Sequence, residues 1–416
     1  MKASDVQTHP RLRVESIDVF RGFTILLMIF VIAVAAGDYR QLPQRASWFG
    51  SLPISTWNHA DVAWERFVEE KMAAGFDLQA IQQMPEARLK NIGLTATDLV
   101  APFFVFIVGL CIPLSRANRG AEWWRRVFSR TAMLILAGIL YISLILGLSW
   151  WWGILQAIGI SYLIGASSLK LPRWGRWVAV FGLLGFHLLM SHSVDWWLHF
   201  GDSEEPFFTI SRLDGSWAKP LRVHCLPWVS ISYGAMTLVG VLLGETVRDG
   251  DRRRILLQSL KLGLVFFLAG WLLHQIGMWT GAVELCFNKP DVTASYAMAA
   301  SGLASLFFGL LYYLIDVRRY RFGLRIFTVL GVNALLAYFM QIVMRLFFRA
   351  THIEPFFSGA PNPVKEQWAG LIDWSLWRQF WLDRTGYGGM LWGAIWCACL
   401  WLIIFFCNKK KFYWKL

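Results

Sequence analysis

Apolar stretches of about 20 residues recur along the whole chain and are separated by polar segments. A helix of roughly that length crosses the hydrocarbon layer of a bilayer. The pattern therefore predicts an all-α polytopic membrane protein, a bundle of about ten transmembrane helices forming a single domain over residues 1–416. The expected spans are 17–37, 97–115, 131–148, 151–169, 177–194, 226–244, 262–281, 295–315, 326–347 and 389–407.

The polar segments between these spans differ in length on the two sides of the expected membrane. The segments on one side are short, whereas those on the other side are long and comprise 38–96, 195–225, 282–294 and 348–388. Long loops with a structure of their own usually carry function. Within the first of them, residues 61–73 and 76–90 have the pattern of short amphipathic surface helices. We expect the substrate on this side.

Composition and charge strengthen the membrane assignment. Hydrophobic residues make up 56% of the chain and charged residues only 16%, against about 25% charged in soluble domains. The net charge of +13 comes from basic residues concentrated in the short loops. This is the positive-inside bias, which places both termini in the cytoplasm. The basic balance therefore indicates topology, with the lipid bilayer as a partner and no nucleic acid.

Two features of the chain allow alternative interpretations. Residues 22–36 have the character of a cleavable signal peptide, but Asp18 and Arg21 lie directly before them in the expected span 17–37 and argue against cleavage. Cys225 and Cys286 both fall near the long-loop side, where a disulfide forms if the geometry allows, and their pairing stays open. No pair or cluster of cysteine and histidine predicts a metal site.

Two residues on the long-loop side are candidates for catalysis. His59 lies in the loop 38–96, and a histidine can accept and return a proton near neutral pH. An exposed loop histidine is the alternative interpretation. Asp98 enters the membrane edge, where a charge is costly. Its alternative role is that of an acidic residue stabilised by the dipole of a helix N-terminus.

Several polar residues interrupt apolar spans. Asp18 and Arg21 are three residues apart, so they share a helix face and can form an ion pair or bind an anionic ligand. Gln156 and Asn333 are amides within spans, where they either bond neighbouring helices or line a site.

Further polar residues lie near the long-loop side. Glu284, Asn288 and Lys289 lie between the seventh and eighth spans, where loop charges are usually solvated. His187 and His274, in apolar stretches, are interpreted as packing histidines.

Taken in order, a series of motifs resembles a known family, the transmembrane acyltransferases related to heparan-α-glucosaminide N-acetyltransferase. The resemblance extends over about residues 11–345, with weaker stretches at 40–56, 61–90 and 170–225. The motifs that carry it are Arg13–Gly22, His59-Ala60, Gly93–Phe104, Phe106–Gly109, Gly153–Gln156, Asn288-Lys289 with Ser295-Tyr296, Tyr313–Val317 and Gly331–Leu335.

The resemblance implies transfer of an acetyl group from cytoplasmic acetyl-CoA to the amine of a glucosamine-type sugar on the far side of the membrane. The family's active histidine corresponds to His59, which either carries the acetyl group or acts as a base. Asp98 would orient this histidine or hold a substrate hydroxyl. The expected acceptor-binding residues are Asn58, Asn288 and Lys289, and the expected acetyl-CoA-binding residues are Arg21, Gln156 and Asn333.

This chain departs from the lysosomal members of the family at several places. Ile32 stands where they have Asn, Ala157 stands where they have Arg, and the stretch between His59 and Gly93 is longer. A bacterial branch is similar in having an insert after the histidine. The short basic loops suit a bacterial inner membrane with the active site facing the periplasm, and a homodimer stays open.

Two other functions compete with this expectation. The first is O-acylation of a periplasmic glycan or lipid by a related acyltransferase. The second is transport of an amino sugar, for which internal repeats and interrupted spans would be expected. No convincing repeat is visible in the sequence.

Overall fold

The structure is a computed structural model that describes residues 14–35, 70–77, 80, 92–94, 96–115, 120–146, 152–193, 228–289, 291–350 and 387–414. Regular structure in these ranges is helical, as expected for an all-α membrane protein, with one isolated β-bridge. The helices of the first half are α1 (Glu15–Ala35), η3 (Ala96–Leu99), α5 (Val100–Cys111), η4 (Ile112–Leu114), α6 (Ala121–Leu146), α7 (Ile154–Ser168) and α8 (Arg173–Ser193).

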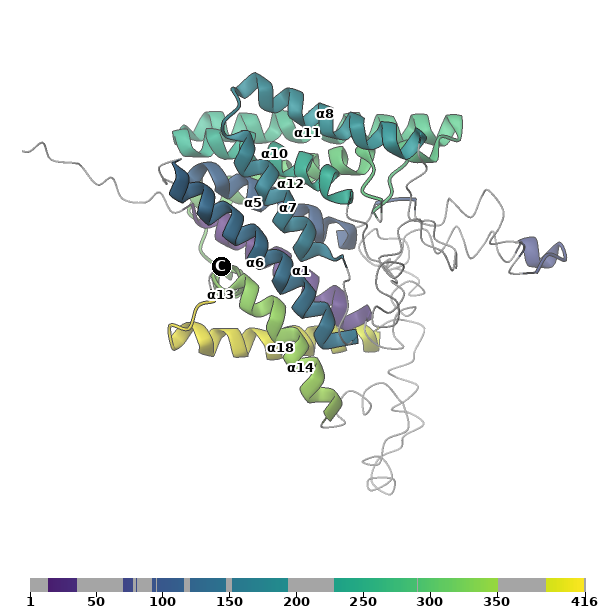
Figure 1. Ribbon diagram of the computed structural model, residues 1–416. Helices are drawn as coiled ribbons and strands as arrows, with labels where there is room; N and C mark the ends of the chain where they lie inside the picture. The colour runs from purple at the N-terminus through teal and green to yellow at the C-terminus, as the bar shows by residue number, and fades with distance from the viewer. Residues whose placement is uncertain are drawn as a thin grey trace, which may run out of the picture.

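The second half of the chain continues the bundle, and its last helix returns to the first. The helices are α10 (Val229–Asp249), α11 (Arg252–Thr280), η5 (Val283–Leu285), α12 (Ala294–Tyr312), η6 (Tyr313–Val317), α13 (Leu324–Val332), α14 (Ala334–Ala350) and α18 (Tyr387–Lys409). In Figure 1, α8 and α11 lie along one side of the bundle, α14 and α18 along the opposite side, and α5, α7, α10 and α12 between them.

Helix α10 is the centre of the bundle and packs against α5, α7, α8, α11 and α12. Small residues allow this central position. A Cβ added at Gly240 or Gly244 would lie well inside contact distance of the α5 carbonyls of Phe106 and Leu110, respectively. Glycines four residues apart let two helix backbones approach closely, as is common in membrane bundles.

A second close crossing joins α1 to α13. A Cβ at Gly22 would overlap the carbonyl of Phe327, and one at Gly331 would overlap the carbonyl of Asp18. Directly after this crossing the chain bends by 88° between α13 and α14. The bend falls at Asn333, whose backbone leaves the helical region.

The segment that follows α18 folds back onto this bend. The Asn333 side chain donates through Nδ2 to the Phe412 carbonyl at 2.8 Å and to Asn408 Oδ1 at 3.2 Å, and its Oδ1 accepts from the Trp414 amide at 3.1 Å. The Asn408 amide in turn donates to the Val329 carbonyl at 2.8 Å. The Asn408 side chain therefore satisfies a carbonyl in the last turn of α13 that the break leaves without a helical donor, and the Asn333 side chain ties the segment after α18 to the bend.

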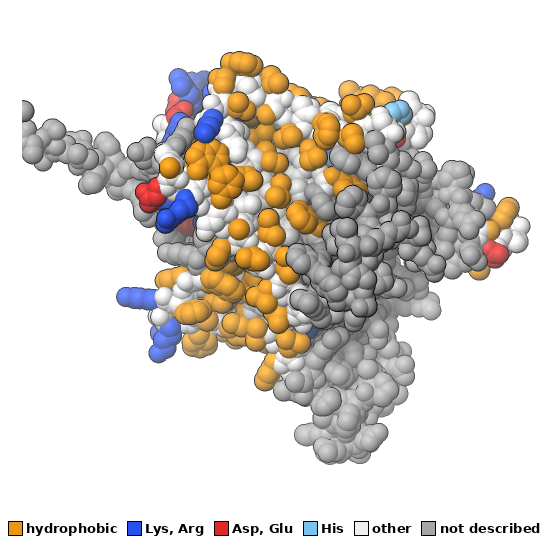
Figure 2. Space-filling model, in the orientation of Figure 1, with side chains coloured by type: hydrophobic (Ala, Val, Ile, Leu, Met, Phe, Trp, Pro, Cys, Tyr) orange, Lys and Arg blue, Asp and Glu red, His pale blue; other side chains and the backbone are white. Residues whose placement is uncertain are grey.

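The surface of the bundle matches a bilayer environment. Large hydrophobic side chains on α8 and α11 are exposed, among them Val178, Phe181, Val265 and Leu268. In the view of Figure 2 hydrophobic side chains cover the middle of the face, and Lys and Arg side chains gather at one edge. We call the end of the bundle that carries Arg248–Arg254, Arg318–Arg325 and Lys409–Lys411 the basic end.

Within the described residues, three helical segments are long and apolar enough to cross a membrane: α10, α11 and the continuous α12–η6. The bent pair α13 and α14 would make a fourth. The expected spans 226–244, 262–281 and 295–315 coincide with the first three. The expected continuous span 326–347 is wrong in its shape, because Asn333 breaks it. The full set of ten spans stays a prediction.

Candidate functional site

At the end of the bundle opposite the basic end, the loop between α11 and α12 meets the residues that precede α5. Ile92 and Asn288 form the isolated β-bridge, and the Gly93 amide donates to the Phe287 carbonyl at 2.9 Å. Gly93 has a φ of 139°, a conformation that favours glycine. This short pairing brings two sequence motifs together. We call the group Asp98, Asn288, Lys289, Asp291 and Tyr296 the polar mouth.

An ion pair lies at the centre of the polar mouth. Lys289 Nζ is 3.1 Å from Asp98 Oδ1, and the Asp98 side chain is only 2% exposed, whereas that of Lys289 is 38% exposed. The Asp98 backbone is held as well, because the hydroxyl of buried Tyr296 donates to its carbonyl at 2.5 Å. The carboxylate therefore has a fixed position, and its cationic partner reaches it from a partly exposed loop.

The loop that carries Lys289 is shaped by internal hydrogen bonds. Thr293 Oγ1 donates to the Cys286 carbonyl at 2.7 Å and accepts from the Asn288 amide at 3.2 Å. Asn288 Oδ1 accepts from the Asp291 amide at 3.1 Å. Asn288 is 4% exposed, so in this structure its side chain shapes the turn beside Lys289. A role in acceptor binding stays a prediction.

Two histidines hold the same loop against the helices, which agrees with their interpretation as packing residues. His274 stacks on Phe287 with ring centroids 4.2 Å apart, and its Nδ1 accepts from the Phe287 amide at 3.1 Å. His187 is buried on α8, lies 3.5 Å from Ser191 Oγ and is hydrogen-bonded to the backbone of Asp291. The polar mouth is thus supported from both α8 and α11.

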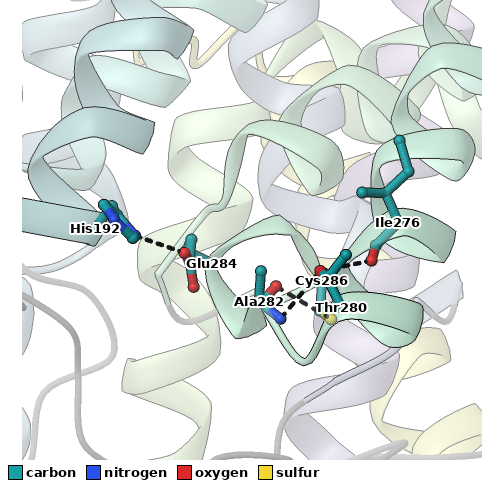
Figure 3. Close-up of polar contacts among 6 residues, drawn as sticks. All are labelled: His192, Ile276, Thr280, Ala282, Glu284 and Cys286. Atoms are coloured by element: carbon teal, nitrogen blue, oxygen red, sulfur yellow. Dashed lines mark hydrogen bonds and ion pairs between the residues drawn. The ribbon is translucent and has the colours of Figure 1, made fainter.

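A third contact links α8 to the start of this loop. His192 Nδ1 lies 2.8 Å from Glu284 Oε1, with His192 exposed at the surface (Figure 3). The neighbouring Cys286 is buried, and its thiol faces the Ala282 carbonyl at 3.8 Å. Burial, together with the charge of Glu284, raises the pKa of this thiol to about 11. Cys286 is a free cysteine here.

The predicted catalytic histidine lies outside the part of the chain that the structure describes. The same holds for Asn58 and for Cys225, so the proposed roles of His59 and Asn58 stay predictions, whereas Cys286, the other half of the possible disulfide, is a free thiol in the structure. Of the expected surface helices 61–73 and 76–90, the structure describes only residues 70–77 and 80.

The expected acetyl-CoA residues do not form one cluster. Arg21 pairs with Asp18 at 3.7 Å, as its spacing predicts, and its guanidinium also donates to the Gly331 carbonyl at 3.3 Å. Asn333 lies close by at the bend and holds the C-terminal segment. The structure therefore brings Arg21 and Asn333 to the same crossing of α1 and α13.

Gln156 belongs to another part of the bundle. It sits in the first turn of α7, where its Oε1 accepts from the Gly153 amide at 3.1 Å. Its side chain fills the space beside Gly138 of α6. This geometry gives Gln156 a capping role, and its role toward acetyl-CoA stays a prediction.

Some residues with strong contacts received no role from sequence reasoning. Tyr296 and Asp291 complete the polar mouth, although Tyr296 was part of a motif that carried the family resemblance. Arg176 is buried, pairs with Glu245 of α10 and donates to the Ser168 carbonyl at 2.9 Å. A basic residue at the start of an apolar helix gives no sign of such a buried partner. Among the described residues, no group of three or more His, Cys, Asp or Glu could hold a metal ion.

Comparison with known proteins gives two findings. The sequence model of the family described as "Heparan-alpha-glucosaminide N-acetyltransferase, catalytic" matches residues 72–280, about half of the chain. This range includes Asp98 and Gln156 and excludes Arg21, His59 and Lys289. The human protein "Heparan-alpha-glucosaminide N-acetyltransferase" is 31% identical over 170 residues, covering 38% of this chain and 19% of the human protein.

Proposed function

This chain belongs to the heparan-α-glucosaminide N-acetyltransferase catalytic family, and on that premise we propose that it moves an acetyl group from cytoplasmic acetyl-CoA to the amine of a glucosamine-type sugar in the periplasm. The observation that carries the proposal is the polar mouth, where a buried carboxylate and an ammonium lie 3.1 Å apart at the end of the bundle opposite the basic end. The polar mouth suits an acceptor that carries an amine, and the basic end suits an anionic donor such as acetyl-CoA.

The chemistry requires a base at the polar mouth. An amino sugar arrives largely as an ammonium ion, and its nitrogen must lose one proton before it attacks the thioester carbon. The C–N bond then forms, the C–S bond breaks, and the nitrogen gives up a second proton as the CoA thiol takes one up. Proton transfer by a placed histidine typically contributes ~10²–10⁴-fold. We assign this role to His59, with Asp98 beside the acceptor.

The basic end fits the donor. CoA carries phosphate groups, and arginine and lysine side chains bind phosphate through charge-assisted hydrogen bonds. Arg318, Arg319, Arg321 and Arg325 lie in or beside the turn before α13, and Arg21 lies where α1 crosses that helix. These residues would hold the phosphates, while the pantetheine arm extends into the bundle.

The experiment uses protein purified in detergent with acetyl-labelled acetyl-CoA and glucosamine. We expect the wild type to form labelled N-acetylglucosamine, and His59→Ala to lose at least about 100-fold in rate, because the proton acceptor is removed. The control is His192→Gln, which changes an exposed histidine near the polar mouth and should retain activity within about threefold. If His59→Ala kept its activity as His192→Gln should, His59 would not be the base.

One observation favours a different function. The 88° bend between α13 and α14 is a broken helix, and broken helices are typical of transporter binding sites. An amino-sugar transporter is therefore the second candidate. Uptake of labelled glucosamine into proteoliposomes without acetyl-CoA would support transport. Labelled product that forms only with acetyl-CoA would support transfer.

A further inference from the structure

We propose that Lys289 is a built-in competitor of the acceptor: its ammonium group occupies, on Asp98, the place that the ammonium group of an amine substrate takes during binding. This inference rests on the proposed function for the identity of the acceptor. It adds a means by which the site distinguishes amines from hydroxyl compounds and from the acetylated product.

The two partners of the ion pair differ in how firmly they are held. Asp98 lies in the short helical turn η3 directly before α5, its side chain is 2% exposed, and its carbonyl is fixed by the Tyr296 hydroxyl. Lys289 extends a flexible four-carbon chain from a loop and is 38% exposed. If one partner leaves, it is the lysine, since its side chain can rotate into water without any backbone change.

A buried carboxylate strongly favours the presence of a cation, because an uncompensated charge is costly away from water. The Lys289 group is a primary ammonium with three hydrogen-bond donors. A protonated amino sugar presents the same primary ammonium. It can therefore replace Lys289 on Asp98 while the carboxylate keeps a cationic partner and Lys289 moves into solvent.

This exchange has consequences for substrate choice and for product release. A sugar with only hydroxyl groups offers no cation, so it cannot replace Lys289. N-acetylation turns the ammonium into a neutral amide, so the product also loses its interaction with Asp98. Lys289 then returns and displaces the product. One ion pair thereby selects the substrate before transfer and favours release after it.

The test measures binding without turnover. Labelled glucosamine is titrated onto the purified wild-type protein and variants in the absence of acetyl-CoA, with labelled N-acetylglucosamine as the neutral probe. We expect Lys289→Gln to bind glucosamine roughly five- to tenfold more tightly, as expected when a directly coupled competitor is removed. Asp98→Asn should bind it at least about tenfold more weakly. Neither variant should change the affinity for N-acetylglucosamine.

Further variants distinguish exchange from a purely structural ion pair. Lys289→Arg keeps the cation and should not bind glucosamine more tightly than the wild type. In an Asp98→Asn background, Lys289→Gln should have no further effect. Lys261→Gln, an exposed lysine in the first half of α11, should behave as the wild type. Unchanged or weaker glucosamine binding by Lys289→Gln, or an equal gain for both sugars, would overturn the proposal.

The outcome is separable from that of the proposed function. If the wild type transfers no acetyl group but Lys289→Gln binds glucosamine more tightly, the exchange on Asp98 is supported and the proposed acetyltransferase function is rejected. If the wild type transfers the acetyl group but Lys289→Gln leaves the glucosamine affinity unchanged, the acetyltransferase function is supported and the exchange on Asp98 is rejected.

Discussion

At the scale of single residues, the polar mouth contains groups whose chemistry is set by their surroundings. Cys286 is 1% exposed, and the Cβ that Gly277 lacks would lie 2.9 Å from its sulfur. Burial and the nearby Glu284 carboxylate both oppose the thiolate, so the pKa of the thiol rises to about 11 from an ordinary value of 9.0. The thiol is therefore protonated at neutral pH, which lowers its reactivity.

We predict that Cys286, as the single cysteine of an otherwise cysteine-free variant, reacts slowly with N-ethylmaleimide at pH 7.5 and rapidly after unfolding in SDS. In the folded protein its rate should rise as the pH approaches 11. A matched single-cysteine protein carrying Thr280→Cys, at an exposed position of the same region, should react quickly. Equal rates for the two folded proteins would contradict the prediction.

The same pKa shift affects stability. The unfolded thiol begins to ionise near pH 9.0, while the folded thiol keeps its proton until about pH 11. The contribution of the Cys286 thiol to folding stability is therefore fully present below pH 9.0 and is lost as the pH rises toward about 11. The free energy of unfolding should fall over this interval. Replacing Cys286 by Ala should make the fall shallower in alkaline denaturation.

Sequence reasoning selected most polar residues of the mouth but not their contacts. Asp98 and Lys289 were each identified by position, whereas their pairing depends on how α5 and α12 pack through Tyr296. Hydrophobic periodicity contains no information on such contacts between distant segments. Tyr296 is an ordinary aromatic residue in an apolar helix until its hydroxyl is seen against the Asp98 carbonyl.

At the scale of helices, close packing depends on glycines at the crossings. We predict that Gly22→Ala destabilises the protein, because the new methyl group would overlap the Phe327 carbonyl, which belongs to backbone and cannot move aside. The expected loss is about 1–3 kcal/mol, measured as a lower melting temperature in detergent.

The control for this prediction is another helical glycine. Among the described residues, and apart from its chain neighbours and the backbone of its own helix, nothing lies within 4 Å of a Cβ added at Gly182 on α8. Gly182→Ala should leave the melting temperature unchanged or slightly raised, since alanine favours helix more than glycine does. If the two variants melted at the same temperature, the α1–α13 crossing would not be tightly packed.

The position of most helices could be predicted, but the shape of one could not. Hydropathy detects apolar composition, and residues 326–347 are apolar throughout except for a few polar side chains. The bend depends on the backbone of Asn333 and on hydrogen bonds from residues after α18. Helix α6 also begins ten residues before its expected span at 131, because the amphipathic segment from Ala121 continues the same helix.

At the scale of the whole molecule, the separation of the basic end from the polar mouth predicts orientation. We expect a green fluorescent protein fused after Leu416 to fluoresce, because basic segments stay in the cytoplasm. Alkaline phosphatase fused after Ala282, near the polar mouth, should be active because it folds in the periplasm. If the green fluorescent protein fused after Leu416 stayed dark while alkaline phosphatase fused at the same position was active, the orientation would be the opposite of the predicted one.

The hydrogen bonds of the Asn333 side chain also have a consequence for the order of folding during synthesis. Within the described chain, the groups bonded to the Asn333 side chain come from residues 75, 79 and 81 positions further along. The segment after α18 must therefore be synthesised before Asn333 and Val329 have these hydrogen-bond partners. Until then the Val329 carbonyl lacks its donor, and an unsatisfied backbone carbonyl is costly wherever water is excluded.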